Sequence, residues 1–291
     1  MQAQSPNFMQ IGSLSDKDKS ALVRLLSDPD PAIYHSVRIA LMDCGSDARS
    51  CLRVGLSSDD RLVRQRSWEL ITFLDRKSAD VDFISFCKRG GENLNLEKGV
   101  WLLIKTVFPH VDQGFYQSIL DDYVQRVRKK CDPKQSFPVT MMEINRVLFE
   151  EEFFLGDKKN YYDPQNSYLN RVIDRKLGNP ISLCLLYLFI SRRLSIPLVG
   201  VAMPGHFILR LQSPAFNIFV DPFNMGNFLT HSQCAARLKR GGFGFESDFL
   251  SPVSSRRILL RICSNLHQIY QKKQHLGERD RIQKYLINLA N

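Results

Sequence analysis

The sequence predicts an α+β protein, because helical patterns fill its first half and short strands follow one strongly apolar helix. This helix is predicted over residues 181–193, directly after Gly178-Asn179-Pro180, since proline in a first helical turn loses no hydrogen bond. Alternating patterns predict strands over 199–203, 207–211 and 217–220, with turns at Pro204-Gly205 and Ser213-Pro214. The expected architecture is a buried helix packed on a small antiparallel sheet.

The first 80 or so residues show a weak helical repetition. Ser27-Asp28-Pro29-Asp30-Pro31 opens one amphipathic helix, and Ser57-Ser58-Asp59-Asp60 opens a second about 30 residues later. Serine and aspartate side chains accept hydrogen bonds from the free N–H groups of a first helical turn. A period near 30 favours HEAT-type helical repeats, and a plain helical bundle is the alternative.

Three regions follow from these patterns: a helical, HEAT-like region over 1–89, the α+β domain over 90–250, and basic closing helices over 251–291. Lys88-Arg89-Gly90-Gly91 marks the first boundary. The second region should open with helices over 94–108, 115–127 and 140–149, broken by the two prolines of the segment 131–138. The glycine-rich segment 237–249 is predicted to be a loop. Helices over 254–270 and 278–289 should close the chain.

Composition indicates a globular protein of the cytoplasm. The longest apolar run covers only residues 183–190, whereas a membrane helix needs about 20 residues. The N-terminus lacks the pattern of a signal peptide. The 7 cysteines are scattered without ligand spacing, which favours reduced, buried thiols and argues against a zinc site. We expect no membrane segment, no metal and no cofactor.

The formal net charge is +10, and the segment 235–291 carries much of it. With 11 Lys/Arg and 4 Asp/Glu, that segment has a charge of 11 − 4 = +7. Such a surface suits nucleic acid or an acidic partner. A solvated helical face is the favoured alternative, because no nucleic-acid-binding motif accompanies the charge.

Three residues form a candidate catalytic constellation: Cys184 in the apolar helix, His206 before a strand, and Asp221 at the end of another strand. A nucleophilic cysteine needs a base to generate the thiolate, and that base needs an acceptor to fix its tautomer. His206 and Asp221 could supply both roles. Alternatively, the pair simply locks two strands together, and Cys184 is inert filling in an apolar helix.

The same region resembles the SirB1 family, a transglutaminase-like branch of the transglutaminase–papain superfamily. The residues that carry the resemblance are Leu148-Phe149-Glu150-Glu151, the segment 161–170 (YYDPQNSYLN), the segment 178–183 (GNPISL), Pro204-Gly205-His206-Phe207 and Asp221-Pro222-Phe223-Asn224. Residues 94–127 are also similar to the helical lead-in of that family. The resemblance implies a transglutaminase-like core and a shared cleft near His206 and Asp221.

The resemblance also implies a missing nucleophile. In active transglutaminase-like enzymes the nucleophilic cysteine begins the helix, and the matching position here is Pro180. Ser182 and Cys184 are the nearest candidates, and Cys184 lies about one turn deeper. The family's pattern therefore favours a catalytically degenerate binding or scaffold protein. A cysteine-type hydrolase or acyltransferase that uses Cys184, His206 and Asp221 is the alternative.

A polar and aromatic cluster precedes the apolar helix, and the resemblance places it near the same cleft. Rigid aromatic rings bind partners at low entropic cost. We therefore expect a binding surface for a protein or peptide partner, although a loop organised by Asp163 and Asn166 would explain part of the cluster. The candidate binding residues are Tyr161, Tyr162, Asp163, Asn166, Tyr168 and, beyond the strand that ends at Asp221, Asn224.

Overall fold

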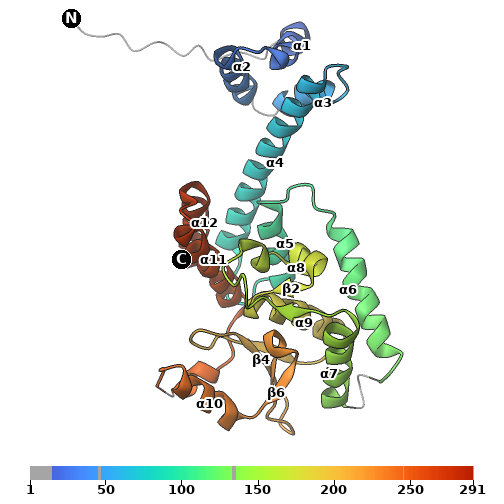
Figure 1. The fold of residues 1–291 in the computed structure, drawn as a ribbon, viewed down its shortest axis with the longest axis vertical. Coiled ribbons are helices and arrows are strands. Elements are labelled where there is room, and N and C mark those ends of the chain that lie inside the picture. Colours follow the sequence, from blue (N-terminus) through green and yellow to red (C-terminus); the bar gives the residue numbers. More distant parts are fainter. Residues whose placement is uncertain (1–14, 45–46, 133–135, 245, 291) are drawn as a thin grey trace, which may run out of the picture. The chain divides into compact units, whose positions relative to one another are not determined.

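The computed structural model describes residues 15–44, 47–132, 136–244 and 246–290 (Figure 1). The N-terminal stretch 1–14 and part of the predicted helix break at 131–138 lie outside these ranges. The chain forms two compact units, residues 1–79 and 80–291. The division falls within the long helix α4 (Arg61–Arg89), ahead of the boundary that the sequence suggests at Arg89, and the closing helices belong to the second unit.

The first unit is helical, as predicted. It contains α1 (Asp16–Arg24), a 3₁₀ turn η1 (Leu25–Ser27), α2 (Pro31–Asp43), α3 (Asp47–Leu56) and the first part of α4. Both predicted caps form: Asp30 Oδ1 accepts from the N–H of Ala32 and Asp60 Oδ1 from the N–H of Leu62. A small core that includes Leu26, Leu41 and Leu52 holds these helices together. The HEAT-type relationship stays a prediction.

The second unit has the predicted α+β organisation around one buried helix, α9 (Pro180–Arg193). Every residue of α9 from Pro180 to Ser191 is buried, which explains its continuous apolar sequence. The sheet has the antiparallel order β3-β4-β5-β6, and α9 contacts β3 and β4. The strands are β3 (Leu198–Val201), β4 (Ile208–Leu211), β5 (Phe219–Asp221) and β6 (Asn227–Leu229).

Helices surround this centre. Before α9 come α5 (Leu96–Lys105), α6 (Gln113–Arg128), α7 (Phe137–Asn145), a π-helical turn η2 (Arg146–Glu151), a 3₁₀ turn η3 (Pro164–Ser167) and α8 (Leu169–Arg175). Two short parallel strands, β1 (Leu155–Gly156) and β2 (Leu177–Gly178), pair beside them. After the sheet come α10 (His231–Arg240), the 3₁₀ turn η5 (Ser247–Leu250), α11 (Ser255–Lys272) and α12 (Leu276–Ala290). Figure 1 shows α11 and α12 side by side, as their contacts confirm.

Two features of the second unit differ from the sequence-based expectation: the strand β6, which was not predicted, and the start of the predicted loop over 237–249. The predicted loop over 237–249 begins as the last turn of α10, whose N-terminus is fixed by a capping box between Thr230 and Gln233. The glycines that suggested a loop begin only at Gly241, after the helix has ended. Within the described residues, no helix combines the length and apolar character needed to cross a bilayer.

Candidate functional site

His206 and Asp221 form the hydrogen-bonded pair that anchors the site. Asp221 ends β5 and His206 follows the turn between β3 and β4, and antiparallel pairing brings these positions to one end of the sheet. The turn needs Gly205, whose φ of +71° lies in the left-handed region that favours glycine. Nε2 of His206 lies 3.0 Å from Oδ1 of Asp221. The sequence therefore correctly identified two residues that lie together.

The Asp221 side chain is fully buried but well compensated. Burial alone would raise the pKa of this carboxyl, but hydrogen bonds from His206, Asn224 and Arg237 outweigh burial and lower the pKa to about 2. Asn224 Nδ2 donates to Oδ2 at 2.8 Å, and Arg237 Nη1 pairs with the same oxygen. Since Asp221 is ionised, Nε2 of His206 carries the shared proton, and Nδ1 has no partner among the described residues.

Arg237 is the residue of this site that the sequence did not reveal. It lies in the last turn of α10, 16 positions after Asp221, in a segment expected to be a loop. The only available signal was a basic residue at the end of a capped helix, which is too common to indicate a partner. Its guanidinium holds Asp221 ionised and attaches α10 to the sheet.

The start of α9 contains no nucleophile. Pro180 occupies the first helical position, and Asn179 caps the helix by accepting from the N–H of Ser182 at 2.9 Å. The Ser182 hydroxyl accepts from the N–H of Asn179 at 3.0 Å and donates to the carbonyl of Asn179 at 3.1 Å. Ser182 is fully buried, so its hydroxyl serves the capping box.

Cys184 lies inside the core. Its side chain is 0 % exposed, and Sγ lies 3.5 Å from the carbonyl oxygen of Phe207, which accepts the thiol proton. Burial, followed by the negative charge of Asp221, raises the pKa of the Cys184 thiol well above its ordinary value. A neutral, inaccessible thiol is a poor nucleophile.

A surface cavity of about 370 Å³ opens beside His206; we call it the His206 cavity. Asn224 and Arg237 also line it, together with the apolar side chains of Met203, Phe223, Leu238 and Phe243. The ring of Phe223 packs edge-on against the imidazole of His206 at a centroid distance of 5.9 Å. The histidine is therefore accessible in a mostly apolar recess, while its aspartate is sealed beneath it.

The loop over 157–166 is held rigidly against the start of α9. Asp157 Oδ1 accepts from the N–H of Asn160 at 2.8 Å, and its Oδ2 accepts from Asn166 Nδ2 at 3.1 Å. The carbonyl of Asn166 accepts from the N–H of Asn179 at 3.2 Å. A loop with these internal hydrogen bonds presents its side chains in a fixed arrangement.

Two predicted binding residues lie in the interior instead. Asn166 is 0 % exposed, because its amide completes the loop's hydrogen bonds. Tyr168 is 2 % exposed, and its hydroxyl lies 3.0 Å from that of Tyr270 on α11. Burial of a tyrosine with its hydroxyl paired is typical of a core position. Both residues therefore support the loop and do not line its surface.

The remaining predicted binding residues do reach the surface. Tyr161 and Tyr162 are 37 % and 48 % exposed, and their rings pack against each other at 5.2 Å. Tyr161 also packs against Phe223 at 6.3 Å, which links the loop to the His206 cavity. Asp163 is occupied, since Oδ1 caps η3 and Oδ2 lies 3.0 Å from Arg175 Nη1. The tyrosines are thus the exposed part of the cluster.

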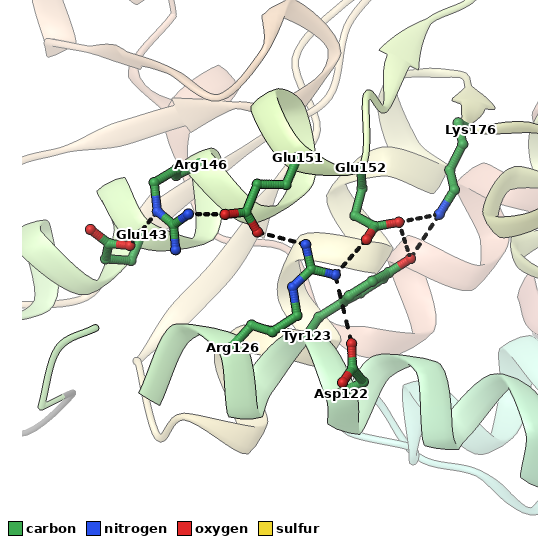
Figure 2. A network of polar contacts seen from close by, with 8 residues as sticks. All are labelled: Asp122, Tyr123, Arg126, Glu143, Arg146, Glu151, Glu152 and Lys176. Atoms are coloured by element: carbon green, nitrogen blue, oxygen red, sulfur yellow. Dashed lines mark hydrogen bonds and ion pairs between the residues drawn. The ribbon is translucent and has the colours of Figure 1, made fainter. Parts of the chain in front are cut away.

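A polar network fixes Glu151 and Glu152, which precede β1 and this loop in the chain (Figure 2). Glu152 accepts hydrogen bonds from Arg126, from Tyr123 and, at 2.6 Å, from Lys176, and Arg126 also pairs with Glu151. Lys176 has a φ of +57° and its carbonyl accepts from the N–H of Leu155, so the network fixes β1 beside β2. Because β1 leads directly into the loop, the network sets the loop's position.

Among the described residues, no group of three or more histidine, cysteine, aspartate or glutamate side chains is arranged to hold a metal ion.

A family model described as the transglutaminase-like superfamily matches residues 115–264, about half of the chain. The chain belongs to the transglutaminase-like superfamily. The matched segment contains α9, the whole four-stranded sheet, the loop 157–166 and the His206–Asp221 pair. The transglutaminase-like α+β fold expected from the sequence is confirmed, with helices added on both sides of the matched segment.

Relatives of two kinds match part of the chain. The chain is 37 % identical over 185 residues to a UPF0162 protein of Xylella fastidiosa. The aligned stretch covers 62 % of the chain and 66 % of that protein. The chain is 31 % identical over 154 residues to a UPF0162 protein of Pseudomonas aeruginosa, covering 52 % and 56 %. It is 34 % identical over 131 residues to mouse F-box only protein 21, covering 42 % and 20 %.

The chain therefore spans just under two thirds of the length of the Xylella relative and a fifth of the F-box protein. No solved structure matches the chain.

Proposed function

We propose that this transglutaminase-like protein is a catalytically degenerate binding module of the SirB1 type, acting in the cytoplasm. The observation that carries the proposal is that the start of α9 presents no accessible thiol. By the family resemblance, the helix position from which transglutaminase-like enzymes present their cysteine corresponds to Pro180, and the Cys184 thiol four residues further on is buried in the core.

The rest of the cleft supports binding. His206 keeps an accessible imidazole over an ionised aspartate, in a recess lined by aromatic and aliphatic side chains. Such a recess with a few fixed polar groups is typical of ligand sites. Without an activated nucleophile, the imidazole is left to hydrogen-bond a bound group through Nδ1. We infer that a segment of a partner protein occupies the cleft, beside the loop over 157–166 that carries Tyr161 and Tyr162, which we call the tyrosine loop.

The alternative is a cysteine hydrolase or acyltransferase built on Cys184, His206 and Asp221. It needs the Cys184 thiol to leave the carbonyl of Phe207, reach His206 and ionise within the core. Burial and the nearby Asp221 charge both oppose that ionisation, because they raise the pKa of the thiol.

Incorporation of a fluorescent primary amine into a glutamine-containing acceptor peptide separates the two functions. A binding module should give no incorporation above a blank, and hydrolysis of a thioester should likewise stay at background. Incorporation or hydrolysis that disappears in both His206→Ala and Cys184→Ala would establish the enzyme and refute the binding module. Since Cys184 is buried, Cys184→Ser serves as the milder variant if Cys184→Ala fails to fold.

A further inference from the structure

The His206 cavity is one end of a longer groove. A second cavity of about 230 Å³, the central cavity, shares Gly205 with it and is lined by Asn179, Arg261, Asn265 and Gln268. A third cavity of about 600 Å³, the lysine cavity, shares Tyr161 and Tyr162 with the central one. The shared lining residues join the three cavities into one groove.

The lysine cavity is strongly positive. Lys158, Lys159 and Lys273 line it, and none of them forms an ion pair with another described residue. The only acidic side chain in its lining, Asp163, is already paired with Arg175 at 3.0 Å. Three uncompensated ammonium groups around one cavity attract a negatively charged ligand.

Cations continue along the tyrosine wall of the groove. Lys272 places its ammonium 3.8 Å from the centroid of the Tyr162 ring, a cation–π contact that leaves its hydrogen-bond donors available. Arg261 lines the central cavity and has no carboxylate partner among the described residues. The two tyrosine rings, which pack edge-to-face with an interplanar angle of 80°, therefore lie between positive groups and offer apolar contacts to a chain that runs past them.

The central cavity offers groups that suit a peptide backbone. Neither the side chain of Asn265 nor that of Gln268 makes a hydrogen bond with another described residue, and each amide carries both donors and an acceptor. A peptide backbone alternates N–H and C=O groups, so such amides can pair with it without regard to its side chains.

The ends of the groove differ in chemistry, which decides between two anionic ligands. A nucleic acid carries one phosphate per nucleotide along its whole length and needs cations throughout. Here the cations without a carboxylate partner among the described residues lie in the lysine and central cavities and beside Tyr162, whereas the His206 cavity is mostly apolar and its one arginine is bound to Asp221. A ligand with a charged end and an apolar end fits better.

We propose that the groove binds an acidic segment of a partner protein, with carboxylate side chains in the lysine cavity and an apolar residue in the His206 cavity. This inference rests on the proposed binding function and specifies its partner. The contribution of each lysine is that of an exposed ion pair, so three together should change affinity about tenfold.

The test is fluorescence anisotropy of the full chain with labelled peptides of alternating glutamate and threonine that carry one leucine, at the N-terminus in one peptide and at the C-terminus in the other. About 12 residues give an extended reach of about 40 Å. The matched ligands have the same length and the same leucine, with glutamine in place of every glutamate. The better-binding glutamate peptide should bind with an affinity that falls as salt rises, and its glutamine counterpart should bind at least about tenfold more weakly.

Two triple variants locate the binding. Lys158→Gln/Lys159→Gln/Lys273→Gln should weaken the glutamate peptide about tenfold. Lys98→Gln/Lys129→Gln/Lys130→Gln removes the same charge from exposed lysines outside the groove and should leave affinity unchanged. An equal loss of affinity for the glutamate peptide in both triple variants, together with displacement of the peptide by an oligothymidylate, would indicate unspecific polyanion binding and overturn the inference. Equal affinity for the glutamate peptide and its glutamine counterpart, or no binding of any peptide, would also overturn it.

The outcome separates from that of the proposed function. If Phe223→Ala abolishes binding and the groove triple does not, the cleft remains a binding site and only the acidic partner is wrong. Amine incorporation that depends on Cys184 overturns the binding function whatever the peptides do.

Discussion

Replacement of Asp221 by asparagine tests the electrostatics of the site most quantitatively. In the folded protein the pKa of Asp221 is lowered from 3.8 to about 2, because the hydrogen bonds from His206, Asn224 and Arg237 outweigh the cost of burial. The carboxylate is therefore more stable in the folded state than in the unfolded one. Each unit of pKa difference is worth about 1.4 kcal/mol, so the ionised group contributes about 2 kcal/mol to folding above pH 4.

The sign of the pH dependence follows from a lowered pKa. The contribution is fully present above the unfolded value of 3.8 and is lost as the pH falls toward about 2. At pH 5 it is nearly complete, and at pH 3 it is smaller by about 1 kcal/mol. Asp221→Asn has no such contribution at either pH. The destabilisation caused by Asp221→Asn should therefore be about 1 kcal/mol greater at pH 5 than at pH 3.

Urea unfolding of the wild type and Asp221→Asn, followed by tryptophan fluorescence and circular dichroism, measures this difference. Coincident unfolding transitions by fluorescence and by circular dichroism are the control for two-state behaviour. Asp174→Asn is the control, because Asp174 is an exposed carboxylate whose partners are Arg171 and Tyr116 and not residues of the Asp221 site. If Asp221→Asn destabilises equally at pH 5 and pH 3, the carboxyl has an ordinary pKa and the account of the site's charge is wrong.

Three further substitutions probe the supports of the second unit by urea unfolding. Arg256 is buried and donates to the carbonyls of Cys87, Gly90, Asn288 and Leu289, so Arg256→Met should cost at least about 3 kcal/mol, and a cost below about 1 kcal/mol would contradict these contacts. Gly226 has a φ of +70°, and a methyl group added there would overlap the amide of Asn145, so Gly226→Ala should lower the free energy of unfolding by about 1 to 3 kcal/mol. A Gly226→Ala/Asn145→Ala double variant should regain only part of this stability, and full recovery of the wild-type stability would show that the backbone is unstrained. Glu152→Gln should lower the free energy of unfolding by about 1 to 3 kcal/mol at neutral pH. The bonds from Arg126 and Lys176 outweigh burial and lower the pKa of Glu152, so this destabilisation should shrink as the pH falls below the unfolded pKa. A destabilisation that grows at low pH would refute the role of the network in Figure 2.

Much of this fold could be predicted because its signals are local. The caps at Asp30 and Asp60 and the start of α9 at Pro180 depend on side chains within one helical turn, and all three form as expected. Three of the four strands of the sheet, β3, β4 and β5, are likewise marked by alternation and by the turn at Gly205, whereas β6 was not predicted. Local hydrogen bonds and backbone preferences depend on residues close together in the sequence, so they can be predicted from it.

The parts that could not be predicted depend on distant contacts. Arg237 reaches Asp221 only because α10 folds back on the sheet. Lys158 and Lys273 line one cavity although 115 positions separate them, since α11 ends beside the tyrosine loop. Tyr168 looked like part of an exposed cluster, but Tyr270 on α11 pairs with its hydroxyl in the interior. Sequence spacing carries no information on such pairings.

The central claim is that the cleft holds an accessible histidine without a usable thiol, and site-resolved thiol labelling tests it most directly. The native full chain is treated with iodoacetamide at neutral pH, and modification of each cysteine is followed by mass spectrometry. Cys44 and Cys131, which are partly exposed, should react first, and Cys184 should react only when urea unfolds the protein. Labelling of Cys184 ahead of both in the native protein, slowed by His206→Ala, would contradict the account.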